Sequence, residues 1–218
     1  MVHQELRSRW YDLTAFMPAD KRDNWWNIVA SAYEQRPFRG LEHLANMLQL
    51  FDKCKDSLKD RYATGFAIFF KNIAYDPLSE DSAEKSAKLL RDFAQETTFD
   101  SANYVAEMIV ASGSSTTDAH LNAGQTGSDD LHYLIDFDMA FLADPEDKFQ
   151  KNELAQRKEY AHLTGEEYAK QRLKVLKLFL QIPNIFATAE LRQEFEERAR
   201  KNISREIELL ENGNRKYD

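Results

Sequence analysis

Apolar side chains recur every three or four residues along almost the whole chain, which is the spacing of one face of an α-helix. The first such segment, from about 4 to 17, carries Leu6, Trp10, Leu13 and Phe16. No segment shows the sustained alternation of a β-strand, and we find no internal repeat and no heptad run. The pattern predicts an all-α protein. Further helices are expected at about 20–35, 41–51, 58–74, 82–96, 100–112, 128–143, 146–161, 164–182 and 188–212.

Local signals mark where some of these helices begin and end. The second helix should stop at Arg36, because a residue that precedes proline avoids the helical region. Ser79 is a candidate N-cap for the helix that follows Pro77, and Asp81 places a carboxylate in its first turn.

The longest interruption runs from Ser112 to Asp130 and is rich in glycine and small polar residues. We expect either a mobile functional loop or a disordered insert there, and no domain boundary, because both flanks have the pattern of one bundle. The chain is therefore expected to form a single domain over residues 1–218. Its last residues, after about 211, should fray.

Composition and charge narrow the classes of function. The chain has 218 residues, 43% of them hydrophobic, and a formal net charge of −8. This acidity argues against non-specific nucleic-acid binding and against an anionic membrane surface, because both require clustered lysine and arginine. One cysteine, Cys54, allows neither an internal disulfide nor a cysteine-based zinc site. With no signal-peptide pattern and no membrane-length apolar window, we expect a cytoplasmic protein.

Ionisable side chains fall where the helical pattern calls for buried ones. Asp138 lies in an apolar stripe, four residues after Leu134, and Lys71 and Asn72 end the most apolar helical segment. A lone buried carboxylate costs several kcal/mol, so Asp138 needs a cationic or hydrogen-bonding partner. Lys71 is a candidate for that partner. Alternatively, its ammonium group reaches water past its apolar stem.

Common catalytic motifs are missing from the sequence. There is no HExxH, no Walker A, no GxGxxG and no GxSxG. Arg39 stands at a helix start and His43 follows one turn later on the same face. On spacing alone, His43 is more typical of a core histidine than of a metal ligand.

Segments spread along the chain together resemble one branch of the HD-domain superfamily, which holds predicted metal-dependent phosphohydrolases. The resemblance covers about residues 5 to 212. It rests on the segments RPFRGLEHLANML, FAIFFKNIAYDP, SAEKSA, MIVASGSS, LIDFDMAFL, RKEY and QRLKVLKLFL. It implies an all-helical bundle with a central metal pocket. The residues that we assign to this former metal pocket are Arg39, His43, Lys71, Asn72, Asp76, Asp138, Arg157 and Arg172.

Most metal-ligand positions implied by the resemblance carry other residues here. The His-Asp doublet that names the superfamily falls on Lys71-Asn72, and the first histidine falls on Arg39. The Asn-Glu pair falls on Ser82-Ala83, and the later histidine region contains Ser112. Asp138 alone is retained. Protonated lysine and arginine have no lone pair for a metal, so we expect no metal-generated hydroxide, no catalytic residue and no cofactor.

These losses predict a pseudoenzyme that acts by binding or as a scaffold. Arg39 and Lys71 are expected to neutralise Asp138 in place of a metal, which would plug the pocket. If the pocket is open instead, Arg39, Lys71, Arg157 and Arg172 suit a phosphate or nucleotide. The expected partner is thus a protein or a phosphate-containing ligand, and a homo-oligomer is compatible with the sequence.

Other interpretations stay open. A working metal-dependent phosphohydrolase would need a different ligand set, drawn from His43, Asp76, His120, Asp136 and Asp138. Metal-free chemistry at a buried Lys71 is another possibility. The adjacent Trp25 and Trp26 indicate either an exposed aromatic surface for a partner or a helix packed between two others.

Overall fold

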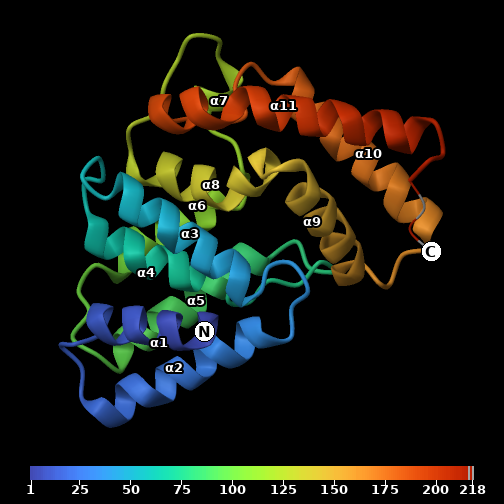
Figure 1. Cartoon of the computed structure of the whole chain (residues 1–218). Helices are drawn as coiled ribbons and strands as arrows, with labels where there is room; N and C mark the ends of the chain where they lie inside the picture. Colours follow the sequence, from blue (N-terminus) through green and yellow to red (C-terminus); the bar gives the residue numbers. More distant parts are fainter. Residues whose placement is uncertain (216, 218) are drawn as a thin grey trace. The chain divides into compact units, whose positions relative to one another are not determined.

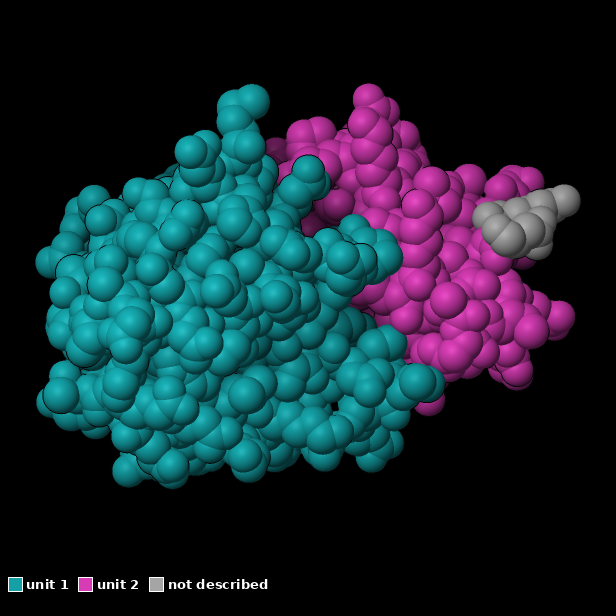
Figure 2. Space-filling model, turned by 90° about the horizontal axis from the view of Figure 1, so that it is seen from below, with its two compact units in different colours: residues 1–115, 129–137 teal, residues 116–128, 138–218 magenta. Residues whose placement is uncertain are grey.

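The computed structural model describes residues 1–215 and 217 and is all-α, which confirms the fold class that the apolar spacing predicts (Figure 1). In that part of the chain the only β-type pairing is an isolated bridge between Gly127 and Thr188. No described helix is long and apolar enough to cross a membrane. The chain divides into two compact units, which Figure 2 colours separately.

The first unit comprises residues 1–115 and 129–137, and the second comprises residues 116–128 and 138–218. The first contains α1 (Val2–Leu13), α2 (Ala19–Glu34), α3 (Leu41–Cys54), α4 (Arg61–Lys71), α5 (Ser82–Gln95) and α6 (Ala102–Ser112). The second contains α7 (Asp118–Leu121), the 3-10 helix η1 (Ala140–Ala143), α9 (Glu146–Glu159), α10 (Gly165–Gln181) and α11 (Ala189–Glu211). One helix, α8 (Asp130–Met139), has residues in both units. The single-domain organisation stays a prediction.

Helix α4 forms the centre of the first unit. Every residue from Ala63 to Lys71 is buried, and α1, α3, α5 and α6 all pack against this helix. The Trp10 ring of α1 meets the rings of Phe69 and Phe93 edge-on, at 5.3 and 5.8 Å between centroids. Such aromatic pairs contribute about 0.5–1.5 kcal/mol each beyond the area that they bury. A helix that is apolar on all sides requires this enclosure.

A fully buried carboxylate fixes the start of α4. Asp130 accepts hydrogen bonds from the backbone N–H groups of Lys59 (2.7 Å) and Asp60 (2.8 Å), and from the Tyr104 hydroxyl (3.2 Å). Asp60 in turn is the N-cap of α4 and accepts from the Ala63 N–H at 2.8 Å. Asp130 thereby ties the loop before α4 to the segment that begins α8.

Unfolding should become easier as the pH rises from about 10 to about 12. Burial, and then the nearby Asp130 carboxylate, raise the pKa of Tyr104 to about 12. The unfolded chain therefore loses this phenol proton before the folded chain does, so the stabilisation is complete below pH 10 and is lost as the pH approaches 12. Urea denaturation between pH 9 and 11.5 should show a shallower pH dependence for Tyr104→Phe than for the wild type. Equal dependence would contradict the role of Tyr104.

Both tryptophans of α2 are buried, so neither forms the exposed aromatic surface that the sequence left open. The Trp25 Nε1–H donates to a Glu96 carboxylate oxygen at 3.0 Å, and Trp26 packs edge-on against the His3 ring at 5.2 Å. Because α1 and α3 both contact α2, two of its faces are covered. The structure therefore agrees with the interpretation of a helix packed between two others.

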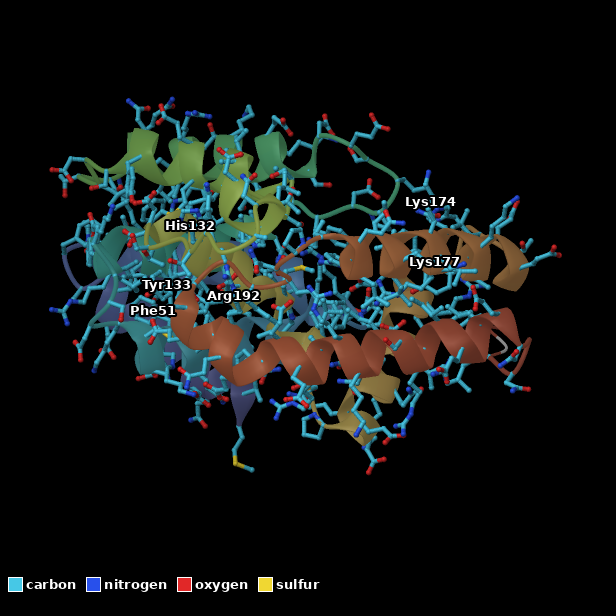
Figure 3. The ribbon with its side chains drawn as sticks, turned by 90° about the horizontal axis from the view of Figure 1, so that it is seen from above. Phe51, His132, Tyr133, Lys174, Lys177 and Arg192 are labelled. Atoms are coloured by element: carbon cyan, nitrogen blue, oxygen red, sulfur yellow. The ribbon has the colours of Figure 1, made fainter. Side chains whose placement is uncertain are left out.

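In the second unit, α11 packs against both η1 and α10. The Asn202 side chain of α11 donates to the carbonyls of Leu142 and Asp144, each at 2.9 Å, which satisfies the end of η1. Lys174 and Lys177 both lie on α10, as Figure 3 shows, and the Lys177 ammonium meets Glu211 of α11 at 2.6 Å. Both ends of this last pair are nearly half exposed.

The segment between Ser112 and Asp130 contains a short helix, α7, that begins at a capping box of Thr117 and His120. The side chain of Asn184 donates to the carbonyls of Ala119 (2.8 Å) and Asn122 (3.0 Å) and holds this turn in place. The segment is therefore not wholly irregular. Its mobility stays a prediction.

The described part of the tail is exposed at residues 211–214 and buried at Tyr217, and its fraying stays a prediction. Tyr217 is 3% exposed, and its hydroxyl donates to Glu206 of α11 at 3.1 Å. Arg215 donates to the same carboxylate at 2.6 Å through Nε. Glu206 is fully buried, so its carboxylate needs hydrogen-bond donors, and Arg215 and Tyr217 supply them.

Candidate functional site

The residues that the sequence assigns to a former metal pocket fall in both units. Arg39, His43, Lys71, Asn72 and Asp76 belong to the first unit. Asp138, Arg157 and Arg172 belong to the second.

Lys71 is the last residue of α4 and is buried, with 9% of its surface exposed. Its ammonium group lies 3.4 Å from the carbonyl oxygen of Ser112, to which it donates. Ser112 ends α6, which packs along α4, and its own hydroxyl donates to the Ile109 carbonyl at 2.7 Å. This carbonyl also accepts from the Ser115 N–H at 3.2 Å, and the negative end of the helix dipole makes a cation a favourable further partner for it.

Asn72 is the C-cap of α4, and an arginine that sequence reasoning missed binds the carbonyls around it. Arg36 donates through Nη1 to the Asn72 carbonyl and through Nη2 to the Ile73 carbonyl at 2.8 Å. These carbonyls follow a helix end, where the backbone lacks intrahelical donors. The sequence shows a cation, Arg36, beside Pro37, but it does not indicate which groups this cation binds.

Arg39 and His43 lie around the ring of Phe38. The Arg39 guanidinium carbon is 4.6 Å from the centre of the Tyr75 ring and 5.3 Å from that of Phe38, and Nη1 donates to the Tyr75 hydroxyl at 3.4 Å. The buried His43 ring is 5.3 Å from Phe38. Arg39 thus stacks on aromatic faces, a contact of about 0.5–2 kcal/mol.

Asp76 serves a turn and is exposed. Its side chain accepts from the Leu78 N–H at 2.9 Å, and its own N–H donates to the Ser82 hydroxyl at 3.1 Å. The prediction of Ser79 as an N-cap is wrong, because Asp81 occupies that position at the start of α5. Ser79 instead donates its hydroxyl to the Asp81 carboxylate.

Arg157 and Arg172 have structural partners that occupy most of their donors. Arg157 donates to the carbonyls of Tyr160 (2.8 Å), Leu163 (3.0 Å) and Tyr217 (3.3 Å). Arg172 forms a two-point contact with the fully buried carboxylate of Glu153. Neither guanidinium is left open for a phosphate, which argues against their assignment to a ligand pocket.

Asp138 and Asp136 of α8 are both buried, with 5% and 0% of their surface exposed. The helical spacing thus correctly marks Asp138 as a buried carboxylate. Its pairing with Arg39 and Lys71 stays a prediction.

No three or more His, Cys, Asp or Glu side chains among residues 1–215 and 217 are grouped so that they could hold a metal ion. The ligand set of the alternative phosphohydrolase gains no support from Asp76 or His120. The Asp76 carboxylate accepts from the Leu78 N–H, and His120 accepts from the Thr117 N–H at 2.9 Å through Nδ1.

Comparison with models of protein families, with curated proteins and with solved structures gives no match to this chain. The resemblance to the HD-domain superfamily therefore stays a prediction.

Proposed function

We propose that this chain is a catalytically inactive relative of the HD-domain phosphohydrolases that acts by binding, as a scaffold, without a metal. The proposal rests first on the resemblance. It also rests on the residue types at the implied ligand positions, where cations and hydroxyls replace imidazoles and carboxylates.

The contact between the Lys71 ammonium and the Ser112 carbonyl carries the proposal. The resemblance puts the histidine of the His-Asp doublet at Lys71 and a later histidine region at Ser112, so a metal centre would need these two positions to be close. They are close, and the contact joins a buried cation to a carbonyl oxygen. An ammonium group that donates in this way cannot also bind a divalent cation.

A scaffold role is favoured over phosphate binding because Arg157 and Arg172, two of the four cations expected to hold a phosphate, bind groups of the protein itself. Arg172 is paired with Glu153, and Arg157 binds three backbone carbonyls. The contacts of Arg157 and Arg172 therefore argue against a phosphate-binding site formed by all four residues.

A second candidate function, metal-free binding of a phosphate group, is favoured by one other observation. Arg36 and Arg39 contact Ile73 and Tyr75 in the turn after α4, and Lys71 is the last residue of α4. Three cations near one turn provide the positive charge that phosphate oxygens prefer.

A thermal-shift screen of the purified chain separates these functions. For a scaffold, we expect no change in Tm with Mg²⁺, Mn²⁺ or Zn²⁺, none with a nucleotide panel, and no phosphatase or phosphodiesterase turnover. A ligand present at 100 times its Kd would add about 2.7 kcal/mol, or roughly 5–10 °C for a chain of this size. A metal-dependent rise of that size with turnover would contradict the proposal, and a rise with nucleotide alone would support the second candidate.

A further inference from the structure

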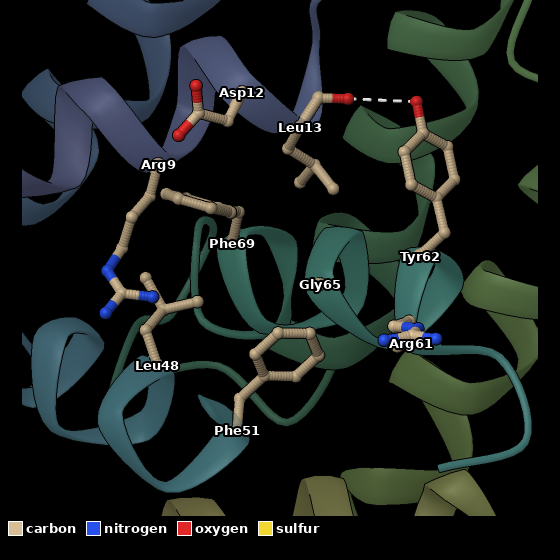
Figure 4. Close-up of a pocket in the computed structure, with 9 residues that line it drawn as sticks. All are labelled: Arg9, Asp12, Leu13, Leu48, Phe51, Arg61, Tyr62, Gly65 and Phe69. Carbon is tan, nitrogen blue, oxygen red and sulfur yellow. Dashed lines mark hydrogen bonds between the residues drawn. The ribbon is translucent and has the colours of Figure 1, made fainter. Parts of the chain in front are cut away.

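A pocket of about 320 Å³ opens between α1, α3 and α4, within the first unit (Figure 4). It lies against the part of α4 from Arg61 to Phe69, whereas Lys71 ends that helix. The eleven residues from Arg61 to Lys71 span about 16 Å of helix. Neither Lys71 nor Ser112 lines the pocket.

Gly65 of α4 lies in the wall of the pocket, where Leu13 of α1 packs against it. A Cβ atom on Gly65 would lie 3.2 Å from a methyl carbon of Leu13, so α1 approaches the bare backbone closely. A glycine inside a helix costs about 1 kcal/mol relative to alanine. The hydroxyl of Tyr62 donates to the Leu13 carbonyl at 2.9 Å, as the dashed line in Figure 4 marks, and fixes the wall beside the glycine. The cavity is thus preformed.

The walls of the pocket are mainly apolar. Leu48 and Phe69 are buried and Phe51 is half-buried, while Leu13 points towards Gly65 in Figure 4. Ligand sites in proteins have about 300–1,000 Å³ and combine apolar walls with a few polar groups. The volume of this pocket is near the lower end of that range, so it suits a small ligand with an apolar part.

Three charged side chains line the pocket: Arg9, Asp12 and Arg61. Arg9 is already engaged, because it pairs with Asp52 and lies 3.5 Å from Glu5; the hydrogen bond that it donates to Asp52 raises its pKa. Arg9 therefore contributes little positive charge to a ligand.

Arg61 is exposed, and its guanidinium has no hydrogen bond or ion pair to any residue in the described part of the chain, 1–215 and 217. It is the first residue of α4, directly after the N-cap Asp60, so the positive charge on this side of the pocket is that of its guanidinium. Asp12 belongs to α1, and Figure 4 places it on the opposite side of the pocket from Arg61. An anionic group is therefore favoured at the Arg61 side and disfavoured at the Asp12 side.

We propose that this pocket binds a small monocarboxylate with an apolar body of about eight carbon atoms. The carboxylate accepts hydrogen bonds from the Arg61 guanidinium, and the body packs on Leu48, Phe51 and Phe69. The inference does not depend on the proposed scaffold function, because no residue of the pocket belongs to the former metal pocket.

A ¹H–¹⁵N NMR titration of the full chain with octanoate tests the proposal. We expect saturable shifts at the amides of Gly65 and Tyr62, and affinity at least fivefold higher for octanoate than for 1-octanol or octylamine. Arg61→Gln should weaken octanoate binding at least fivefold while leaving 1-octanol unchanged. Arg91→Gln is the matched control, since Arg91 is an exposed arginine of α5 outside the pocket.

A second variant, Gly65→Met, fills the cavity and should abolish the shifts. Arg61 is exposed, so Arg61→Gln should fold and still tests the proposal if Gly65→Met does not fold. The proposal is overturned if octanoate shows no saturable binding, if Arg61→Gln binds it as tightly as the wild type, or if octylamine binds equally well.

Discussion

Replacing Arg172 with methionine is expected to lower the free energy of unfolding by about 3–5 kcal/mol. The Arg172 guanidinium donates through Nε to Glu153 at 2.8 Å and makes a second bond to the same carboxylate. Glu153 is fully buried and Arg172 is 8% exposed. Burial by itself would lower the pKa of Arg172, but the Glu153 charge and hydrogen bond outweigh it and raise that pKa above its usual value. The methionine variant would leave Glu153 as an uncompensated buried charge.

Urea denaturation of three variants measures this effect. The double variant Arg172→Met/Glu153→Leu removes both charges and should recover most of the lost stability, because an apolar pair can replace a buried ion pair at little cost. Lys177→Met is the matched control on the same helix, since its pair with Glu211 is nearly half exposed on both sides, and should cost about 0–1 kcal/mol. A loss below about 1 kcal/mol for Arg172→Met would show that Glu153 is not held as described.

The second large effect is expected from the end of the chain. Arg215 and Tyr217 both donate to the fully buried Glu206, at 2.6 and 3.1 Å, and Tyr217 packs edge-on against the ring of Tyr168 at 4.8 Å. Removing both donors in Arg215→Met/Tyr217→Phe leaves, among residues 1–215 and 217, a weak contact from Gln150 at 3.4 Å. We expect a loss of about 3–5 kcal/mol in the free energy of unfolding.

Adding Glu206→Gln to the Arg215→Met/Tyr217→Phe variant should restore part of the stability, because a neutral amide does not leave a buried charge. Arg205→Met provides the control on α11, since Arg205 forms an exposed pair with Glu146 and should contribute about 0–1 kcal/mol. Thermal or urea unfolding of each variant gives the comparison. If the tail variant unfolds like the wild type, the tail does not stabilise the second unit.

The helical fold follows from local sequence, because the spacing of apolar residues is a local property. The expected segment at 20–35 is α2 (Ala19–Glu34), and the expected segment at 82–96 is α5 (Ser82–Gln95). Helix ends were less predictable. The first helix stops at Leu13 and not at about 17, because the Thr14 hydroxyl donates to the Trp10 carbonyl at 2.6 Å. A side chain that bonds to the backbone in this way competes with the helix.

The candidate site was only partly predictable. Burial of Lys71, Asn72 and Asp138 followed from their positions in apolar stripes, since a helical stripe marks the face that packs. The partners of Arg157 and Arg172 did not follow, because they are backbone carbonyls and a carboxylate brought near by packing. The residue type gives the sign of a side chain's charge, but it does not indicate which group the side chain contacts.

The sequence by itself determined that the chain is helical and that Asp138 is a buried carboxylate. It placed Lys71 at the end of the most apolar helical segment but left open whether the ammonium group reaches water. The tertiary structure alone decided that Lys71 donates to Ser112, that Arg172 neutralises Glu153, and that Gly65 and Leu13 line a pocket. The physical reason is that periodicity records which face of a helix is buried, whereas the partner of a buried charge and the space beside a glycine depend on residues from helices distant in sequence.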